Sequence, residues 1–192
     1  YWYDYIVKER SKKIVELETE FNTLYQGEGK KKWNYNTDIG IAVEKLRQVI
    51  ESISEVIYKE LFKVALAAIL LDVSNLYRNG KCLSYKKKWE DRKIVEKDVF
   101  DKFDEKVLKE LKCDIENSIT RTKINNKERL YNQDSRIGIA NEVDDNSIDL
   151  VITSPPYLNS RDYTDTYMLE LKTLGFTKTS EEIKELREKT LR

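Results

Sequence analysis

Asp149-Leu-Val-Ile-Thr-Ser-Pro-Pro-Tyr157 is the stretch that decides the fold class of this chain. Residues 147–153 form a short run of apolar and β-branched side chains ended by two prolines, which predicts a buried strand. The flanking sequence predicts a strand over residues 128–132, a short helix or turn over 136–141 and a helix over 163–174. Strand, short helix, strand, loop and helix in this order are typical of an open α/β sheet.

The sequence upstream of this stretch predicts helices. Apolar side chains recur every three or four residues over 5–25, 39–77 and 100–115, which indicates amphipathic helices. Residues 62–71 are apolar on nearly every side, so we expect the most buried helix there. Asn79-Gly80 predicts a turn.

Two signals mark where the last helices of the chain end and begin. Gly175 predicts the end of the helix over 163–174, and Thr179 with Glu182 predicts a capping box in front of a final helix. Taken with the helices predicted upstream and the strands predicted downstream, the sequence indicates an α/β protein. We expect a mainly helical region over 1–120 and part of an open sheet over 121–192.

The composition excludes several kinds of site. The chain has 192 residues, 35 basic and 35 acidic side chains, two cysteines and no histidine. Ser-His-Asp triads, Cys-His dyads and histidine-based zinc sites are excluded, and Cys82 and Cys113 form no CxxC pair, so we expect no metal. We expect a cytoplasmic protein, because unpaired cysteines suggest a reducing compartment and no apolar run approaches the roughly 18 residues of a membrane span. Residue 1 is Tyr, so we expect an excerpt of a longer product.

Pro155 and Pro156 are the only prolines of the chain, and they are adjacent. Two prolines fix φ and remove two N–H donors, so the carbonyls of Ser154 and Pro155 become acceptors with little local competition. The Ser154 hydroxyl and the Tyr157 ring complete a rigid cluster at the carboxyl end of a predicted strand, where ligands bind in open sheets. This cluster suits a planar group with an amino edge, such as a nucleobase. A tight Pro-Pro turn after a strand is the alternative interpretation.

This stretch resembles the catalytic motif of the S-adenosylmethionine-dependent amino-methyltransferases that modify DNA at cytosine N4 or adenine N6. Agreement extends over about residues 130–176 and includes Asn132-Gln-Asp-Ser-Arg136 and Leu158-Asn-Ser-Arg-Asp-Tyr163. The resemblance implies a Rossmann-like sheet, S-adenosyl-L-methionine as cofactor and double-stranded DNA as substrate in a restriction–modification setting. Ser-Pro-Pro-Tyr favours cytosine N4, with adenine N6 as the alternative.

The resemblance also implies roles for the motif residues. Ser154 and Pro155 would accept hydrogen bonds from the exocyclic amine of a flipped-out base, Pro156 would hold the loop rigid, and Tyr157 would stack on the base. No covalent intermediate is needed, whereas carbon-5 methylation needs a Cys after Pro that this chain lacks.

Cofactor and DNA contacts follow from the same resemblance. Asp134 and Thr153 are placed at the cofactor, where the acidic group would accept from the adenine amine; a helix N-cap is an equally good interpretation of Asp134. Asn159, Arg161 and Tyr163 follow the catalytic loop and are candidates for DNA contact. A solvated loop position is the favoured interpretation of Arg161.

Two Lys-Lys-Lys-Trp sequences, Lys30–Trp33 and Lys86–Trp89, join basic residues to an aromatic ring. Such a combination suits nucleic acid. Solvated lysines beside a tryptophan that anchors to the core are the favoured interpretation. The neutral net charge argues against indiscriminate coating of nucleic acid, but it leaves room for a local basic patch.

The glycine motif by which this family binds its cofactor is missing. Gly27-Glu28-Gly29 is not followed by the residues of a βα turn, so we expect a second chain or a segment outside this sequence to supply the motif. Two other functions stay open. One is a non-catalytic module that binds DNA or a partner subunit, and the other is a methyltransferase that acts on RNA or a small amine.

Overall fold

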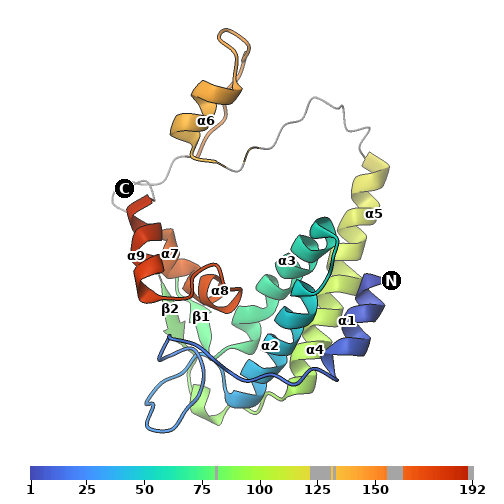
Figure 1. The fold of residues 1–192 in the computed structure, drawn as a ribbon, viewed down its shortest axis with the longest axis vertical. Helices are drawn as coiled ribbons and strands as arrows, with labels where there is room; N and C mark the ends of the chain where they lie inside the picture. The colour runs from blue at the N-terminus through green and yellow to red at the C-terminus, as the bar shows by residue number, and fades with distance from the viewer. Residues whose placement is uncertain (81, 122–130, 132, 155–161, 190–192) are drawn as a thin grey trace.

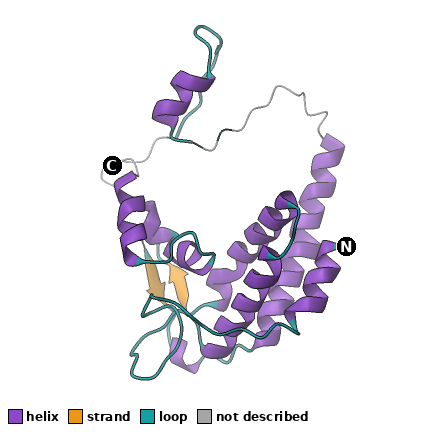
Figure 2. Cartoon of the chain, viewed as in Figure 1, coloured by secondary structure: helices purple, strands orange, loops and turns teal. Residues whose placement is uncertain are grey.

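The computed structural model describes residues 1–80, 82–121, 131, 133–154 and 162–189. They form a mixed structure in which a helical body carries a two-stranded sheet (Figures 1 and 2). Its elements are α1 (Trp2–Arg10), α2 (Thr37–Glu51), α3 (Val56–Val73), β1 (Leu76–Arg78), β2 (Leu83–Tyr85), η1 (Trp89–Asp91), α4 (Glu96–Glu105), η2 (Lys106–Leu111), α5 (Lys112–Arg121), α6 (Ser135–Glu142), α7 (Tyr163–Thr166), α8 (Met168–Thr173) and α9 (Ser180–Lys189).

Helices α2 and α3 form the centre of the body. The α2 side chains at three- and four-residue spacings are buried, as are the corresponding side chains of α3, because each helix presents one apolar stripe to the other elements. The expected helical pattern over 39–77 is thus confirmed, but as two helices. Ser52 ends α2, with its hydroxyl donating to the Val49 carbonyl oxygen over 2.7 Å.

The predicted amphipathic helix over 100–115 is also confirmed. Helix α4, the π-helical segment η2 and α5 follow one another without a break. Val99, Phe103 and Val107 are buried, and the Phe103 ring lies 6.4 Å from that of Phe62 in α3. Aromatic and aliphatic contacts of this kind hold the α4–η2–α5 segment on the α2–α3 pair.

The two strands form an antiparallel hairpin after α3. Leu76 pairs with Tyr85 and Arg78 with Leu83. The expected turn at Asn79-Gly80 is confirmed, because it joins the strands and Gly80 has a φ of 86°, a conformation that favours glycine.

The last helices return to the body. Leu169, Leu174 and Ile183 are buried in the same core cluster as Ile6, Leu46 and Phe103. Gly175, with φ of 75°, follows the end of α8 as predicted. The predicted capping box is confirmed: the Glu182 N–H donates to Thr179 Oγ1 over 3.1 Å, and the Thr179 N–H donates to Glu182 Oε2 over 3.4 Å.

The predicted helix over 5–25 is wrong beyond α1. Ile14 is 94% exposed, and residues 11–25 form no helix. Phe21 and Leu24 are nevertheless buried, because a loop carries them into the core and the adjacent Tyr25 bridges to Tyr35. Apolar spacing therefore indicated the burial of Phe21 and Leu24, but it failed at Ile14 and did not indicate a helix.

The predicted buried strand over 147–153 is also wrong. These residues have no strand pairing, and Val151 and Ile152 are 76% and 88% exposed. A strand is stable when it pairs with others, and no described residue pairs with this segment. Of the predicted strand over 128–132, Tyr131 is described and lies in no strand; the other residues lie outside the described ranges. The predicted short helix over 136–141 is confirmed as α6.

No helix in the described ranges is both long and apolar enough to cross a membrane. The division into regions over 1–120 and 121–192 stays a prediction.

Candidate functional site

The residues of the predicted catalytic loop are described only at its edges. Thr153 and Ser154 are exposed and lie in no regular element. Pro155, Pro156 and Tyr157 lie outside the described residues, as do Asn159 and Arg161. The chain is described again from Asp162, where the segment after the loop begins.

Asp134 lies at the start of α6. Its carbonyl oxygen accepts the N–H groups of Ile137 over 3.0 Å and Gly138 over 2.8 Å, so it occupies the N-cap position, and its side chain is exposed. Helix α6 stands apart from α7 in the structure (Figure 1).

The segment that follows the loop is fixed at its first helix. Asp162 Oδ1 accepts the Thr164 N–H over 2.8 Å and caps α7, and Tyr163, half exposed, is the first residue of that helix. Arg187 of α9 donates to Thr164 Oγ1 over 2.9 Å and pairs with Asp165. The chain therefore leaves the loop through a helix held by α9.

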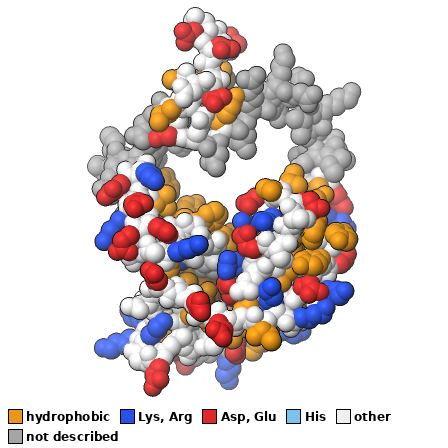
Figure 3. Space-filling model, in the orientation of Figure 1, with side chains coloured by type: hydrophobic (Ala, Val, Ile, Leu, Met, Phe, Trp, Pro, Cys, Tyr) orange, Lys and Arg blue, Asp and Glu red, His pale blue; other side chains and the backbone are white. Residues whose placement is uncertain are grey.

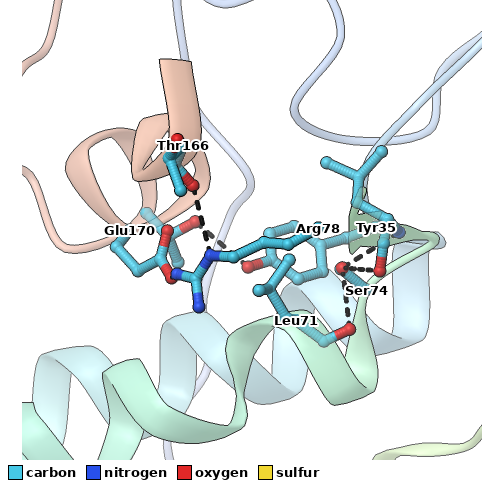
Figure 4. Close-up of polar contacts among 8 residues, drawn as sticks. Tyr35, Leu71, Ser74, Arg78, Thr166 and Glu170 are labelled. Carbon is cyan, nitrogen blue, oxygen red and sulfur yellow. Dashed lines mark hydrogen bonds and ion pairs between the residues drawn. The ribbon is translucent and has the colours of Figure 1, made fainter. Parts of the chain in front are cut away.

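The hairpin holds the same segment through Arg78, a residue that no sequence pattern indicated. Figure 4 shows its guanidinium reaching Glu170 of α8 and the carbonyl oxygen of Thr166, which it contacts over 3.4 Å. The guanidinium also lies 4.9 Å from the centroid of the Tyr167 ring, an attractive cation–π arrangement. Burial raises the pKa of Glu170, and the Arg78 charge opposes this shift. These contacts give the loop a fixed downstream end.

Two pockets lie elsewhere in the described structure. One, of about 360 Å³, is lined by Phe21, Tyr25, Arg47, Lys172 and Thr177, among others. Burial raises the pKa of Tyr25 to about 12 and lowers that of Lys172. The other, of about 580 Å³, is mainly apolar and lies between α1, α3 and the η2–α5 segment. No residue of the predicted site lines either pocket.

Asp134 and Thr153, the two candidate contacts for S-adenosylmethionine, are exposed and line neither of these two pockets. Gly27 and Gly29 lie in the loop before α2, away from any βα turn. Within the described ranges, no three Asp, Glu, Cys or His side chains gather in a way that could hold a metal ion.

The sequence of the chain can be compared with known proteins. It is 33% identical to the type II methyltransferase M.BsoBI of Geobacillus stearothermophilus in an alignment 152 residues long that covers 69% of this chain and 30% of that protein. It is 31% identical to the type II methyltransferase M.AvaI of Nostoc sp. in an alignment 160 residues long that covers 73% of this chain and 31% of that protein. This chain is similar to type II methyltransferases.

The similarity extends well beyond the residues of the predicted motif. The aligned 69% to 73% of the chain includes more than residues 130–176, so the helical body shares in it. The chain spans about a third of the length of these curated relatives. No protein-family model matches the chain, and no solved structure matches it.

Proposed function

We propose that this chain is part of an S-adenosylmethionine-dependent DNA methyltransferase that modifies the exocyclic N4 amine of cytosine within a restriction–modification system. The observation that carries the proposal is the similarity to type II methyltransferases over 69% to 73% of the chain. The Thr-Ser-Pro-Pro-Tyr sequence at 153–157 supports the choice of an amine as the methyl acceptor.

In this proposal the loop residues act by positioning the base. Ser154 Oγ and the Pro155 carbonyl accept hydrogen bonds from the amine, which orients its lone pair, and Tyr157 stacks on the flipped base. Asn159, Arg161 and Tyr163 contact the DNA next to the loop. S-Adenosylmethionine supplies the electrophilic methyl group when bound, with Asp134 and Thr153 as its contacts from this chain.

The apolar segment before the loop supports a Rossmann-like sheet formed together with further strands. Ile148, Leu150, Val151 and Ile152 are between 56% and 88% exposed. A contiguous apolar surface of this kind is usually covered by a partner. We infer that strands of a second chain, or of a segment outside this sequence, cover it and bring the glycine motif of the cofactor site.

Methylation of mixed-sequence duplex DNA tests the proposal. The chain, together with the segment or second chain that supplies the glycine motif, is incubated with S-adenosylmethionine and plasmid DNA, and the digested nucleosides are analysed by mass spectrometry. We expect N4-methylcytosine from the native chain, loss of at least about a hundredfold in Ser154→Ala and Tyr157→Ala, and no loss in Ser11→Ala, a matched exposed serine.

Three outcomes would contradict this proposal. N6-methyladenine in place of N4-methylcytosine would contradict the choice of base. Full activity in both loop variants would contradict the roles given to Ser154 and Tyr157. Absence of both methyl transfer and calorimetric binding of S-adenosylmethionine would contradict enzymatic activity of this chain, and weaker binding in Asp134→Ala would support the cofactor contact.

A further inference from the structure

The two Lys-Lys-Lys-Trp sequences lie side by side, although they are far apart in the chain. The indole rings of Trp33 and Trp89 meet edge to face, with centroids 4.9 Å apart. The Tyr85 ring lies 5.1 Å from Trp89 and extends this aromatic cluster. The proposed catalytic loop makes no use of these residues.

Hydrogen bonds hold the first sequence in place. Trp33 Nε1 donates to Asn36 Oδ1 over 2.8 Å, and Asn75 Nδ2 donates to the Trp33 carbonyl oxygen over 3.2 Å and to Asn36 Oδ1 over 3.0 Å. Trp89 is 6% exposed, which confirms the expectation that this tryptophan anchors to the core. The lysines beside both rings are therefore carried on a rigid support.

The end of α3 holds the second sequence in place. Lys86 Nζ donates to the carbonyl oxygens of Leu71, Asp72 and Ser74 over 2.7, 3.1 and 2.8 Å, so its ammonium group caps the C-terminal end of α3. Lys88 adopts a φ of 53° and a ψ of 40°, a left-handed conformation that is uncommon for a residue other than glycine. The chain reverses there and leaves Lys87 and Lys88 exposed.

Four lysines remain exposed around the aromatic cluster, and we call them the basic patch: Lys31, Lys32, Lys87 and Lys88. Within the part of the chain that the structure describes, none of the four forms an ion pair, and the Lys32 ammonium lies 5.5 Å from the Tyr85 ring centroid.

Several lysines of the continuous α4–η2–α5 segment differ, because they pair with acidic residues four positions away; these pairs include Lys97–Asp101, Lys106–Glu110 and Lys109–Glu105. Acidic and basic side chains are likewise mixed over the face drawn in Figure 3. The chain has no net charge, so four unpaired lysines in one place are a local excess.

We propose that the basic patch binds the phosphate backbone of double-stranded DNA, as a surface separate from the loop that receives the base. The proposal rests on the proposed function, which makes duplex DNA the substrate. Lysine is a compact positive charge that contacts phosphate without reading bases, so the patch adds affinity and orientation without selecting sequence.

Anisotropy of a fluorescent duplex of mixed sequence tests the patch. Binding is measured from about 50 to 200 mM salt, a range over which phosphate contacts lose affinity steeply. The patch variant is Lys31→Gln, Lys32→Gln, Lys87→Gln and Lys88→Gln. The control replaces an equal number of exposed lysines on α1, in the turn after it, on η2 and on α5: Lys8, Lys12, Lys109 and Lys112. Circular dichroism checks that both variants fold.

We expect the patch variant to bind at least about tenfold more weakly at low salt and to lower the slope of log affinity against log salt by about 2 to 4. The control should change neither quantity by as much as half of these amounts. Equal affinities and slopes in the two variants would overturn the patch, as would absence of duplex binding by the native chain at low salt or tighter patch-dependent binding of single-stranded RNA.

Methyl transfer by the same variants separates this proposal from the proposed function. The patch variant should retain kcat and raise KM for DNA, whereas Ser154→Ala should bind duplex normally. Patch-dependent binding without methyl transfer by the native chain supports the patch and contradicts the proposed function. Methyl transfer with a KM that the patch variant leaves unchanged overturns the patch and leaves the function standing.

Discussion

The hydroxyl groups of Tyr35 and Thr173 lie 3.1 Å apart, in a buried hydrogen bond between residues 138 positions apart in the sequence. Tyr35 is fully buried and Thr173 is 3% exposed. Leu169 and Leu174 are buried in the same core cluster as Tyr35. The segment that follows the predicted catalytic loop is therefore fastened to the first helices of the chain.

Tyr35→Phe tests how strongly this bond fastens the segment. The variant leaves the Thr173 hydroxyl buried without its partner, so we expect a loss of about 1 to 2 kcal/mol in the free energy of unfolding, measured with urea. Thr173→Val removes the other partner. The double variant should lose less than the sum of the single losses, because the two hydroxyls form one bond. Strictly additive losses would show that the bond contributes nothing.

Asp104 should contribute far more to stability than an ordinary surface acid. Its carboxylate accepts two hydrogen bonds of 2.6 and 2.8 Å from Arg10, which is 7% exposed and also lies over the Phe100 ring. Asp104→Ala leaves a buried charge without its partner, so we expect a loss of about 2 to 4 kcal/mol in urea denaturation. Asp101→Ala breaks an exposed pair with Lys97 and should cost less than about 1 kcal/mol. Similar losses in the two variants would contradict this difference.

Lys86 should make the free energy of unfolding depend on pH in the alkaline range. Burial, with the Arg92 charge nearby, lowers its pKa from 10.5 to about 8. Between these values the unfolded chain binds more protons than the folded chain, so the free energy of unfolding contributed by this group rises with pH. Urea curves recorded from pH 7 to 10.5 should therefore show the native chain gaining stability relative to Lys86→Met, which lacks the group. Parallel profiles for the two proteins would contradict the lowered pKa; Lys87→Met, at an exposed position, serves as the control.

Thr177→Val should stabilise the protein. Thr177 is 3% exposed, and its hydroxyl has no hydrogen-bond partner among the described residues. Valine has the same shape and no hydroxyl to desolvate, so we expect a gain of about 1 kcal/mol in thermal or urea unfolding. Thr173→Val, in which a bonded hydroxyl is lost, should shift stability in the opposite direction. A loss in both variants would indicate that Thr177 has a partner after all.

The helices could be predicted from the sequence where a single apolar stripe packs against the core. The stripes of α2, α3 and α4 follow helical spacing, and local turn chemistry marked Asn79-Gly80, Gly175 and the Thr179 cap. The same spacing misled at 11–25, where Phe21 and Leu24 reach the core from a loop. The short apolar and β-branched run misled at 147–153, because a strand also needs a partner that local sequence does not reveal.

The sequence predicted which chemical groups form the candidate site, but it predicted only part of their arrangement in space. The motif at 153–157 and the short helix after Asp134 follow from local sequence. The contacts that fix the downstream end of the loop, such as Arg78 with Glu170, join distant parts of the chain and leave no local signal. The meeting of Trp33 with Trp89 is of the same kind, since each lysine run looks like ordinary solvated sequence when read separately.

The burial of Leu169, Leu174 and Ile183 in the core of the first helices has a consequence for a chain that is cut. A protease nick between residues 122 and 162 separates the chain into two polypeptides, yet the buried side chains, the Tyr35–Thr173 bond and the Arg78–Glu170 pair still hold α7–α9 on the body. The two fragments should then migrate as one particle in gel filtration and separate only in denaturant. Fragments made apart should also reassociate when mixed, so that the protein could be reconstituted from two halves.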